Sequence, residues 1–171
     1  MKGPVQAVFM GIILLAGCGR TVPCRNQFVT PAFIGFKLSD LDTLVVREYK
    51  KDDNFLTLLD TALIISDSNI LSKGSSNDTT IVLLNDIVAG EGKYIFPDHD
   101  WQIYIPAQNI TVAMSKFVSP QNDQKCVLGG DLCPTCSNSI DSFLQNGQQV
   151  IPQYGKISFT GGNFYLTYIH R

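Results

Sequence analysis

Short runs with a two-residue hydrophobic period recur along the chain. Apolar side chains alternate with polar or small ones over residues 34–38, 101–105 and 110–115, which is the spacing of strands that bury one face. Residues 44–49 combine β-branched and aromatic side chains and so favour another strand. Polar residues 50–54 follow as a turn. The pattern predicts strands joined by short turns.

Two segments between these runs are less uniform. Residues 55–65 are apolar almost throughout, and both a buried strand and a helix stay open because Leu56, Leu59 and Leu63 also fit helical spacing. Residues 66–78 are polar and predict a loop, and residues 79–84 then predict a compact strand.

Two further elements are expected near the C-terminus. The apolar positions of residues 140–144 predict one short helix, with Ser139 as its N-cap and Gly147 beyond its end. Residues 157–159 and 164–169 predict a closing hairpin around a glycine-rich turn.

Seven or eight short strands with little helix predict an all-β fold. We expect an antiparallel β-sandwich, Ig-like or transthyretin-like, with at most one short helix, and a small barrel as the alternative. The 171 residues suffice for one ordinary domain. Lysine and arginine number 13 against 15 acidic residues, and the formal net charge is -2. Duplex-binding domains carry a basic excess, so nucleic acid is not an expected partner.

The N-terminus carries an export-type leader. Lys2 precedes an apolar stretch over residues 5–16, which is shorter than the roughly 20 residues that cross a bilayer and matches the apolar core of a signal peptide. The tetrapeptide Leu15-Ala16-Gly17-Cys18 resembles the bacterial lipobox. That resemblance implies a signal peptide over residues 1–17, cleavage before Cys18 and a diacylglycerol group on its sulfur. An ordinary secretory leader and a buried apolar segment are the alternatives.

The whole chain resembles the small, largely uncharacterised lipoproteins of Bacteroidota. The resemblance rests on the lipobox, on a short tether over residues 18–31 and on a single β-rich domain over residues 32–171, and it implies no activity. It implies that the membrane is a partner through the lipid on Cys18, and that the protein lies in the cell envelope. Gly19 is not the aspartate that retains enterobacterial lipoproteins at the inner membrane, so the outer membrane is favoured and its face stays open.

Four cysteines follow Cys18, namely Cys24, Cys126, Cys133 and Cys136. An even number in an oxidising compartment predicts disulfides. We expect Cys24 to bond to one of the three later cysteines and the other two to bond to each other, with the choice open. The alternatives are a redox pair at Cys133 and Cys136, or half of a zinc site together with Cys126. The strand–helix context of a redox motif and a second pair of zinc ligands are both missing from the sequence pattern.

The triplet Asp98-His99-Asp100 is the most site-like part of the sequence. It could supply a general base or metal ligands, although its position after Pro97 and before a strand favours a solvated turn. Trp101 is in phase with the buried positions of that strand. Tyr104 lies on the opposite face and is the better candidate for contact with a ligand.

A non-catalytic binding or structural module of the envelope is therefore the expected function. An envelope protein or a glycan is the expected partner, and no cofactor or metal is expected. An anchored hydrolase that uses loop carboxylates and His99 is one alternative, and a metal or redox protein based on the cysteines is the other.

Overall fold

The computed structural model describes residues 20–65, 71–73, 80–83, 95–126, 136–156 and 163–171. The predicted leader and Cys18 lie outside the described residues. The chain divides into two compact units. We call residues 1–25 and 121–138 the small unit, and residues 26–120 and 139–171 the sandwich unit.

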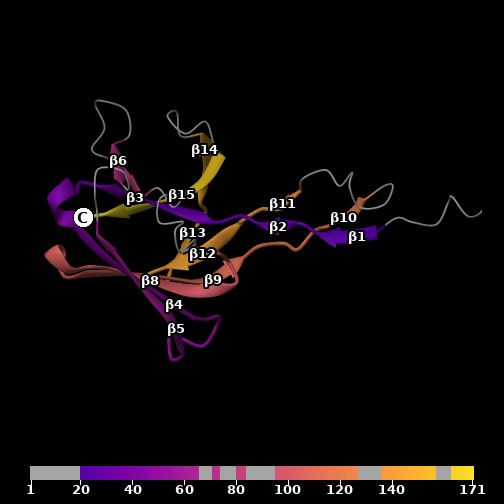
Figure 1. Ribbon diagram of the computed structural model, residues 1–171, viewed down its shortest axis with the longest axis horizontal. Coiled ribbons are helices and arrows are strands. Elements are labelled where there is room, and N and C mark those ends of the chain that lie inside the picture. The colour runs from indigo at the N-terminus through magenta and orange to yellow at the C-terminus, as the bar shows by residue number, and fades with distance from the viewer. Residues whose placement is uncertain (1–19, 66–70, 74–79, 84–94, 127–135, 157–162) are drawn as a thin grey trace, which may run out of the picture. The chain divides into compact units, whose positions relative to one another are not determined.

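The larger sheet of the sandwich unit has six strands, and every pairing in it is antiparallel (Figure 1). In spatial order its strands are β13 (Gln148–Val150), β12 (Ser142–Gln145), β9 (Ile110–Val118), β8 (His99–Ile105), β4 (Thr43–Lys50) and β5 (Leu58–Ile65). In the segment 55–65, for which the sequence allows a strand or a helix, residues 58–65 form a strand, because β5 pairs with β4 along its length.

The second sheet has five strands, and it combines strands from the beginning and from the end of the sequence of the sandwich unit. Its spatial order is β14 (Gln153–Lys156), β15 (Asn163–His170), β3 (Val29–Ile34), β7 (Thr80–Leu83) and β6 (Leu71–Lys73). The pairing of β3 with β15 is parallel, from Val29 opposite Tyr165 to Ile34 opposite His170, and the other pairings are antiparallel.

The two sheets share one apolar core, which confirms the predicted all-β sandwich. Val29 and Phe33 of β3 belong to the same buried cluster as Ile103 of β8 and Met114 of β9. The rings of Phe117 and Phe143 stack in this cluster with centroids 5.0 Å apart. Burying such side chains contributes about 1.5–3 kcal/mol each. The helical turns in the described residues are two short 3-10 segments, η1 (Leu38–Leu41) and η2 (Pro106–Gln108).

The predicted alternation holds best in β8 and β9. Trp101, Ile103 and Ile105 are buried, and the indole Nε1 of Trp101 donates to the carbonyl of Phe96 at 2.9 Å. In β9 the buried positions change phase after Met114, and Lys116 adopts a left-handed φ of 55° there. A single left-handed residue lets the strand turn its next apolar side chain back to the core.

The short helix predicted at residues 140–144 is wrong. Residues 142–145 form β12, and Asn146 and Gly147 turn the chain into β13 with φ angles of 50° and 79°. Two successive left-handed residues make the tight hairpin turn that Asn-Gly favours. This local turn overrides the helical spacing of the apolar side chains.

Three boundaries also differ from prediction. The first strand of the sandwich ends at Ile34, and the chain turns at Gly35 (φ 80°) instead of continuing to residue 38. The closing hairpin takes β14 as its first strand, whereas residues 157–159 lie outside the described part of the chain. The predicted loop at residues 66–78 contains β6.

Two clusters of polar side chains stabilise the sandwich unit through hydrogen bonds. Gln145 of the larger sheet accepts a hydrogen bond from Oγ1 of buried Thr167 at 2.7 Å and donates to the carbonyl of Tyr168 at 3.0 Å. Asp40 of η1 accepts the Gln108 amide at 2.8 Å and lies 3.5 Å from the guanidinium of Arg171. Buried polar groups that are fully hydrogen-bonded add specificity to an apolar core.

The small unit contains strands in the segment expected to be a tether. β1 (Arg20–Pro23) pairs antiparallel with β10 (Asp123–Cys126), and β2 (Arg25–Asn26) pairs with β11 (Ser137–Asn138) at the boundary of the unit. In the part of the chain that the structure describes, no helix is long and apolar enough to cross a membrane.

We predict that Phe143→Ala lowers the free energy of unfolding by about 3–5 kcal/mol, because it removes a buried ring and leaves a cavity. Tyr154→Ala serves as the control, since Tyr154 is 62% exposed, and should cost less than about 1 kcal/mol. Chemical denaturation measures both. A loss under about 1 kcal/mol for Phe143→Ala would contradict the assigned core.

Candidate functional site

The triplet Asp98-His99-Asp100 sits where the chain enters β8, but its three side chains do not converge. Asp98 is held by Asn26, whose Nδ2 donates to both carboxylate oxygens at 3.0 and 2.9 Å. This contact ties the start of β8 to residues just before β3. Asp98 therefore has a structural role, because its carboxylate links the start of β8 to Asn26.

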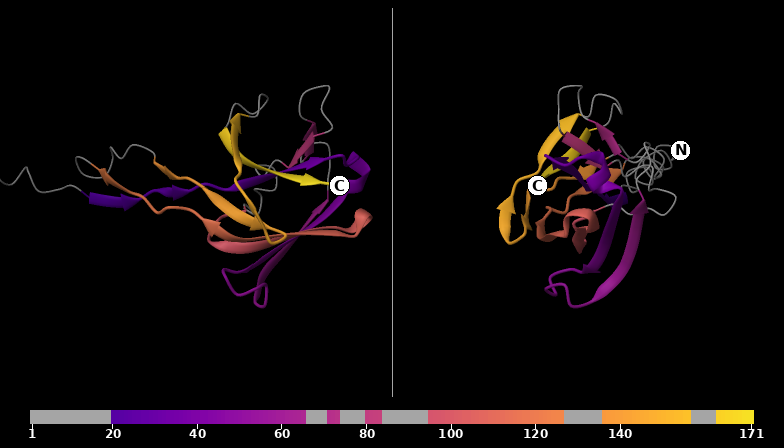
Figure 2. Two further views of the ribbon diagram at one scale, coloured as in Figure 1. Left: turned by 180° about the vertical axis from the view of Figure 1, so that it is seen from behind. Right: turned by 90° about the vertical axis from the view of Figure 1, so that its left-hand side faces the viewer.

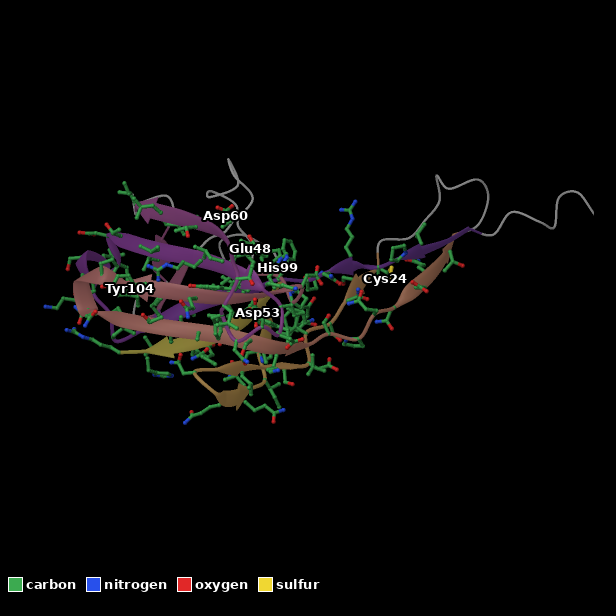
Figure 3. The ribbon with its side chains drawn as sticks, turned by 90° about the horizontal axis from the view of Figure 1, so that it is seen from below. Cys24, Glu48, Asp53, Asp60, His99 and Tyr104 are labelled. Atoms are coloured by element: carbon green, nitrogen blue, oxygen red, sulfur yellow. A yellow bond between two sulfur atoms is a disulfide. The ribbon has the colours of Figure 1, made fainter. Side chains whose placement is uncertain are left out.

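His99 is paired with a carboxylate that the sequence pattern did not single out. Its Nδ1 lies 2.8 Å from Oε1 of Glu48 on the neighbouring strand β4. Figure 3 shows the two side chains together on adjacent strands. The rings of His99 and Trp101 form a T-shaped pair, with centroids 6.3 Å apart. A carboxylate that orients an imidazole is one component of general-base chemistry.

Asp100 is buried, with 1% of its surface exposed. Its Oδ2 accepts the backbone N–H of Asp52 at 3.0 Å, whereas Oδ1 is buried without a hydrogen-bond partner. Burial raises the pKa of this carboxyl, and the nearby charge of Asp52 adds to the effect, while the Asp52 amide opposes it. The neutral acid is thus favoured at this position relative to an exposed aspartate.

The turn between β4 and β5 covers Asp100 and carries unusual backbone angles. Asp52, Asn54 and Phe55 all have left-handed φ angles, between 55° and 61°. The Asp53 carboxylate accepts the backbone N–H groups of Leu56 at 3.2 Å and Thr57 at 2.9 Å. Hydrogen bonding to Thr57 lowers the pKa of Asp53.

Two outside contacts hold the same turn. The Phe55 ring meets the Tyr49 ring edge-on with centroids 5.3 Å apart, and Lys116 of β9 lies 3.5 Å from the Asp52 carboxylate. These contacts compensate left-handed angles that non-glycine residues rarely adopt. Asp52 and Asp53 therefore stabilise the conformation of the turn.

Tyr104 lies on the outer face of β8, toward the end opposite His99 (Figure 3). The guanidinium carbon of Arg47 is 5.8 Å from its ring centroid, and its hydroxyl donates to Oδ1 of Asn109 at 3.3 Å. On the same face the Tyr49 hydroxyl donates to Oε1 of Gln102 at 3.1 Å. Half-buried aromatic rings beside amide and guanidinium groups suit the binding of polar ligands.

Cys24 and Cys136 form a disulfide across a sequence separation of 112 residues. This bond realises the expected link between Cys24 and the later cysteines, and it removes Cys136 from a redox pair with Cys133. Cys133 and Cys18 lie outside the described residues, and the structure describes Cys126 only as backbone in β10.

Asn138 organises the surroundings of the disulfide and was missed by sequence reasoning. It is fully buried, and its Oδ1 accepts the backbone N–H of Asn122 at 2.9 Å. Its Nδ2 donates to the Cys24 carbonyl and to Oε1 of Gln121, each at 3.2 Å. A lone asparagine in a polar stretch gives no sequence signal for such a role.

Two further observations concern metal binding and similarity to known proteins. Among the described residues, no group of three histidine, cysteine, aspartate or glutamate side chains is placed to hold a metal ion. No family model, no curated protein and no solved structure matches the chain.

We predict a specific pH dependence for Asp100→Asn. The folded protein keeps Asp100 protonated above the unfolded-state pKa of about 3.9, so the wild-type free energy of unfolding falls as pH rises from there to the raised folded pKa. The variant lacks this titration, so its stability relative to the wild type should increase through that window.

Urea denaturation between acidic and neutral pH measures the difference. Asp42→Asn, which replaces an exposed carboxylate, is the control for the loss of a surface carboxylate. A difference between Asp100→Asn and wild type that stays constant with pH would contradict the raised pKa.

Proposed function

We propose that the protein is a lipid-anchored envelope lipoprotein whose β-sandwich binds a partner or serves a structural role. The observation that carries the proposal is the disulfide between Cys24 and Cys136 in a chain whose leader ends in a lipobox-like sequence. Disulfides persist in oxidising compartments outside the cytosol. The predicted export leader and the disulfide therefore both support a location outside the cytosol.

The anchor would follow from chemistry at Cys18. A thiol nucleophile takes up the diacylglycerol, and each buried CH₂ group of the acyl chains contributes about 0.8 kcal/mol to membrane binding. Gly19 after this cysteine favours the outer membrane.

The contacts of the triplet support a non-catalytic role. Asp98 is engaged by Asn26, and Asp100 is covered by the turn after β4, so the two carboxylates have structural partners. The outer face around Tyr104, Arg47 and Gln102 is the surface that we assign to partner binding. Its aromatic and amide groups suit a glycan or a polar protein surface.

The contact between His99 and Glu48 favours one second candidate, an anchored hydrolase. The imidazole is oriented by a carboxylate at 2.8 Å, and the His99 side chain is 37% exposed. In this alternative His99 would act as the general base with Glu48 as its positioning residue.

Mass spectrometry of the protein isolated from bacterial membranes tests the anchor. We expect a mature chain that starts at Cys18 and carries added diacylglycerol mass, and we expect Cys18→Ser to lose both the lipid and the cleavage. An intact Met1, or a processed terminus without acyl mass, would overturn the proposal.

A panel of ester, amide and glycoside substrates separates the two candidates. The binding role predicts no turnover that depends on His99, so wild type and His99→Asn should behave alike. The control is His170→Asn, which changes the other, exposed histidine. Turnover that is lost in His99→Asn and kept in His170→Asn would establish the hydrolase instead.

A further inference from the structure

The edge strand β5 is long and apolar. Among the described strands it pairs only with β4, through seven of its eight residues, and it lies at the edge of the larger sheet (Figure 1). The hairpin of β4 and β5 projects from the sandwich unit in the right view of Figure 2. Leu63 and Ile65 are 62% and 67% exposed, and Leu58 and Leu59 are about half exposed.

The other edges of the two sheets are different. β13 and β6 have three residues each and β14 has four. Short edges resist strand addition, as do edges that carry lysine, proline or several charges. β5 contains no lysine or proline, and Asp60 is its one charged residue. Among the described edges of the two sheets, β5 is therefore the long one, and its protection is limited to the charge of Asp60 and the irregularity of its ladder with β4.

We propose that β5 pairs antiparallel with β5 of a second copy of this chain, around a two-fold axis at Ala62. The inference rests on the edge strand and does not depend on the lipid anchor. Four of the exposed side chains of β5 are large and apolar, and β5 of a second copy supplies apolar side chains that can cover them. Two-fold symmetric pairing is the commonest way in which such a surface covers itself.

The register that we propose for the two β5 strands follows from the shift in the ladder between β4 and β5 and from the position of Asp60. The ladder with β4 shifts between Glu48 and Tyr49, which leaves Leu59 as the extra residue, so the regular part of β5 is centred near Ala62. This centre places Leu63 opposite Thr61 of the copy. It separates the two Asp60 carboxylates by four residues along the ladder, about 13 Å, so that like charges do not meet.

The paired strands would make a small interface. Seven residues of strand extend about 24 Å, which places the contact at the lower end of specific interfaces. The six strands of the larger sheet would then continue across the axis into the larger sheet of the copy.

Cysteine crosslinking in membranes from cells that express the full chain tests the register. With an added oxidant, Ala62→Cys should give a covalent dimer on a non-reducing gel, because paired residues on the axis bring their Cβ atoms within disulfide reach. Ala113→Cys is the matched control, a half-buried alanine on the interior strand β9, and should stay at the crosslinking level of the wild type.

Sedimentation velocity of the purified full chain in mild detergent tests the surface. We expect a dimer for wild type, and we expect Leu63→Lys to weaken its association about tenfold or more, because it removes an apolar side chain from the contact between the strands and places an ammonium group there. The control is Ile151→Lys, at a 75% exposed position outside β5, which should leave the dimer intact.

The remaining outcomes overturn the proposal. A monomeric wild type would do so, as would a dimer that survives Leu63→Lys or that fails to crosslink at Ala62. Wild-type binding to lipid vesicles in place of dimerisation, lost in Leu63→Lys, would assign the edge to a membrane surface instead. Circular dichroism of each variant confirms that the fold is retained.

Discussion

The parallel pairing of β3 with β15 is the contact on which the sandwich depends. β3 lies in the interior of the five-stranded sheet, and five of its six residues are buried. Its partner β15 comes from the end of the chain. Without this pairing, Ile103 and Met114 on the inner face of the larger sheet would lack the second sheet as a packing partner. The second sheet therefore forms only when both ends of the sandwich unit are present, a non-local requirement typical of slowly folding β proteins.

The fold class could be predicted because one-sided burial leaves a two-residue period, as in β8 at Trp101, Ile103 and Ile105. The helix expected at 140–144 is wrong because three apolar side chains at helical spacing occur in a strand, whose conformation is decided by the Asn146-Gly147 turn after it. The partner of β3 could not be predicted, since nothing local to residues 29–34 selects a strand at the far end of the chain. Edge position likewise depends on topology, so the exposure of β5 emerges only in the folded chain.

The candidate site shows the same division. The sequence placed Asp98, His99 and Asp100 together, yet their partners Asn26, Glu48 and Asp52 come from separate segments. The pairing of the strands decides which of these meet. Adjacent residues of a strand point to opposite faces, so neighbours in sequence become separate in function. Tyr104 could be assigned to the outer face from its phase with Trp101, because that inference needed only the local period.

The cysteines connect the structure to the proposed location. The sequence predicted that Cys24 bonds within the later cluster, and the choice of Cys136 depends on contacts such as those of buried Asn138. Peptide mapping of the protein isolated from cells without reductant, after alkylation of free thiols, tests the account most directly. The account predicts a disulfide-linked pair of peptides containing Cys24 and Cys136. Alkylated, unlinked Cys24 in the native protein would contradict both the bond and the oxidising compartment inferred from it.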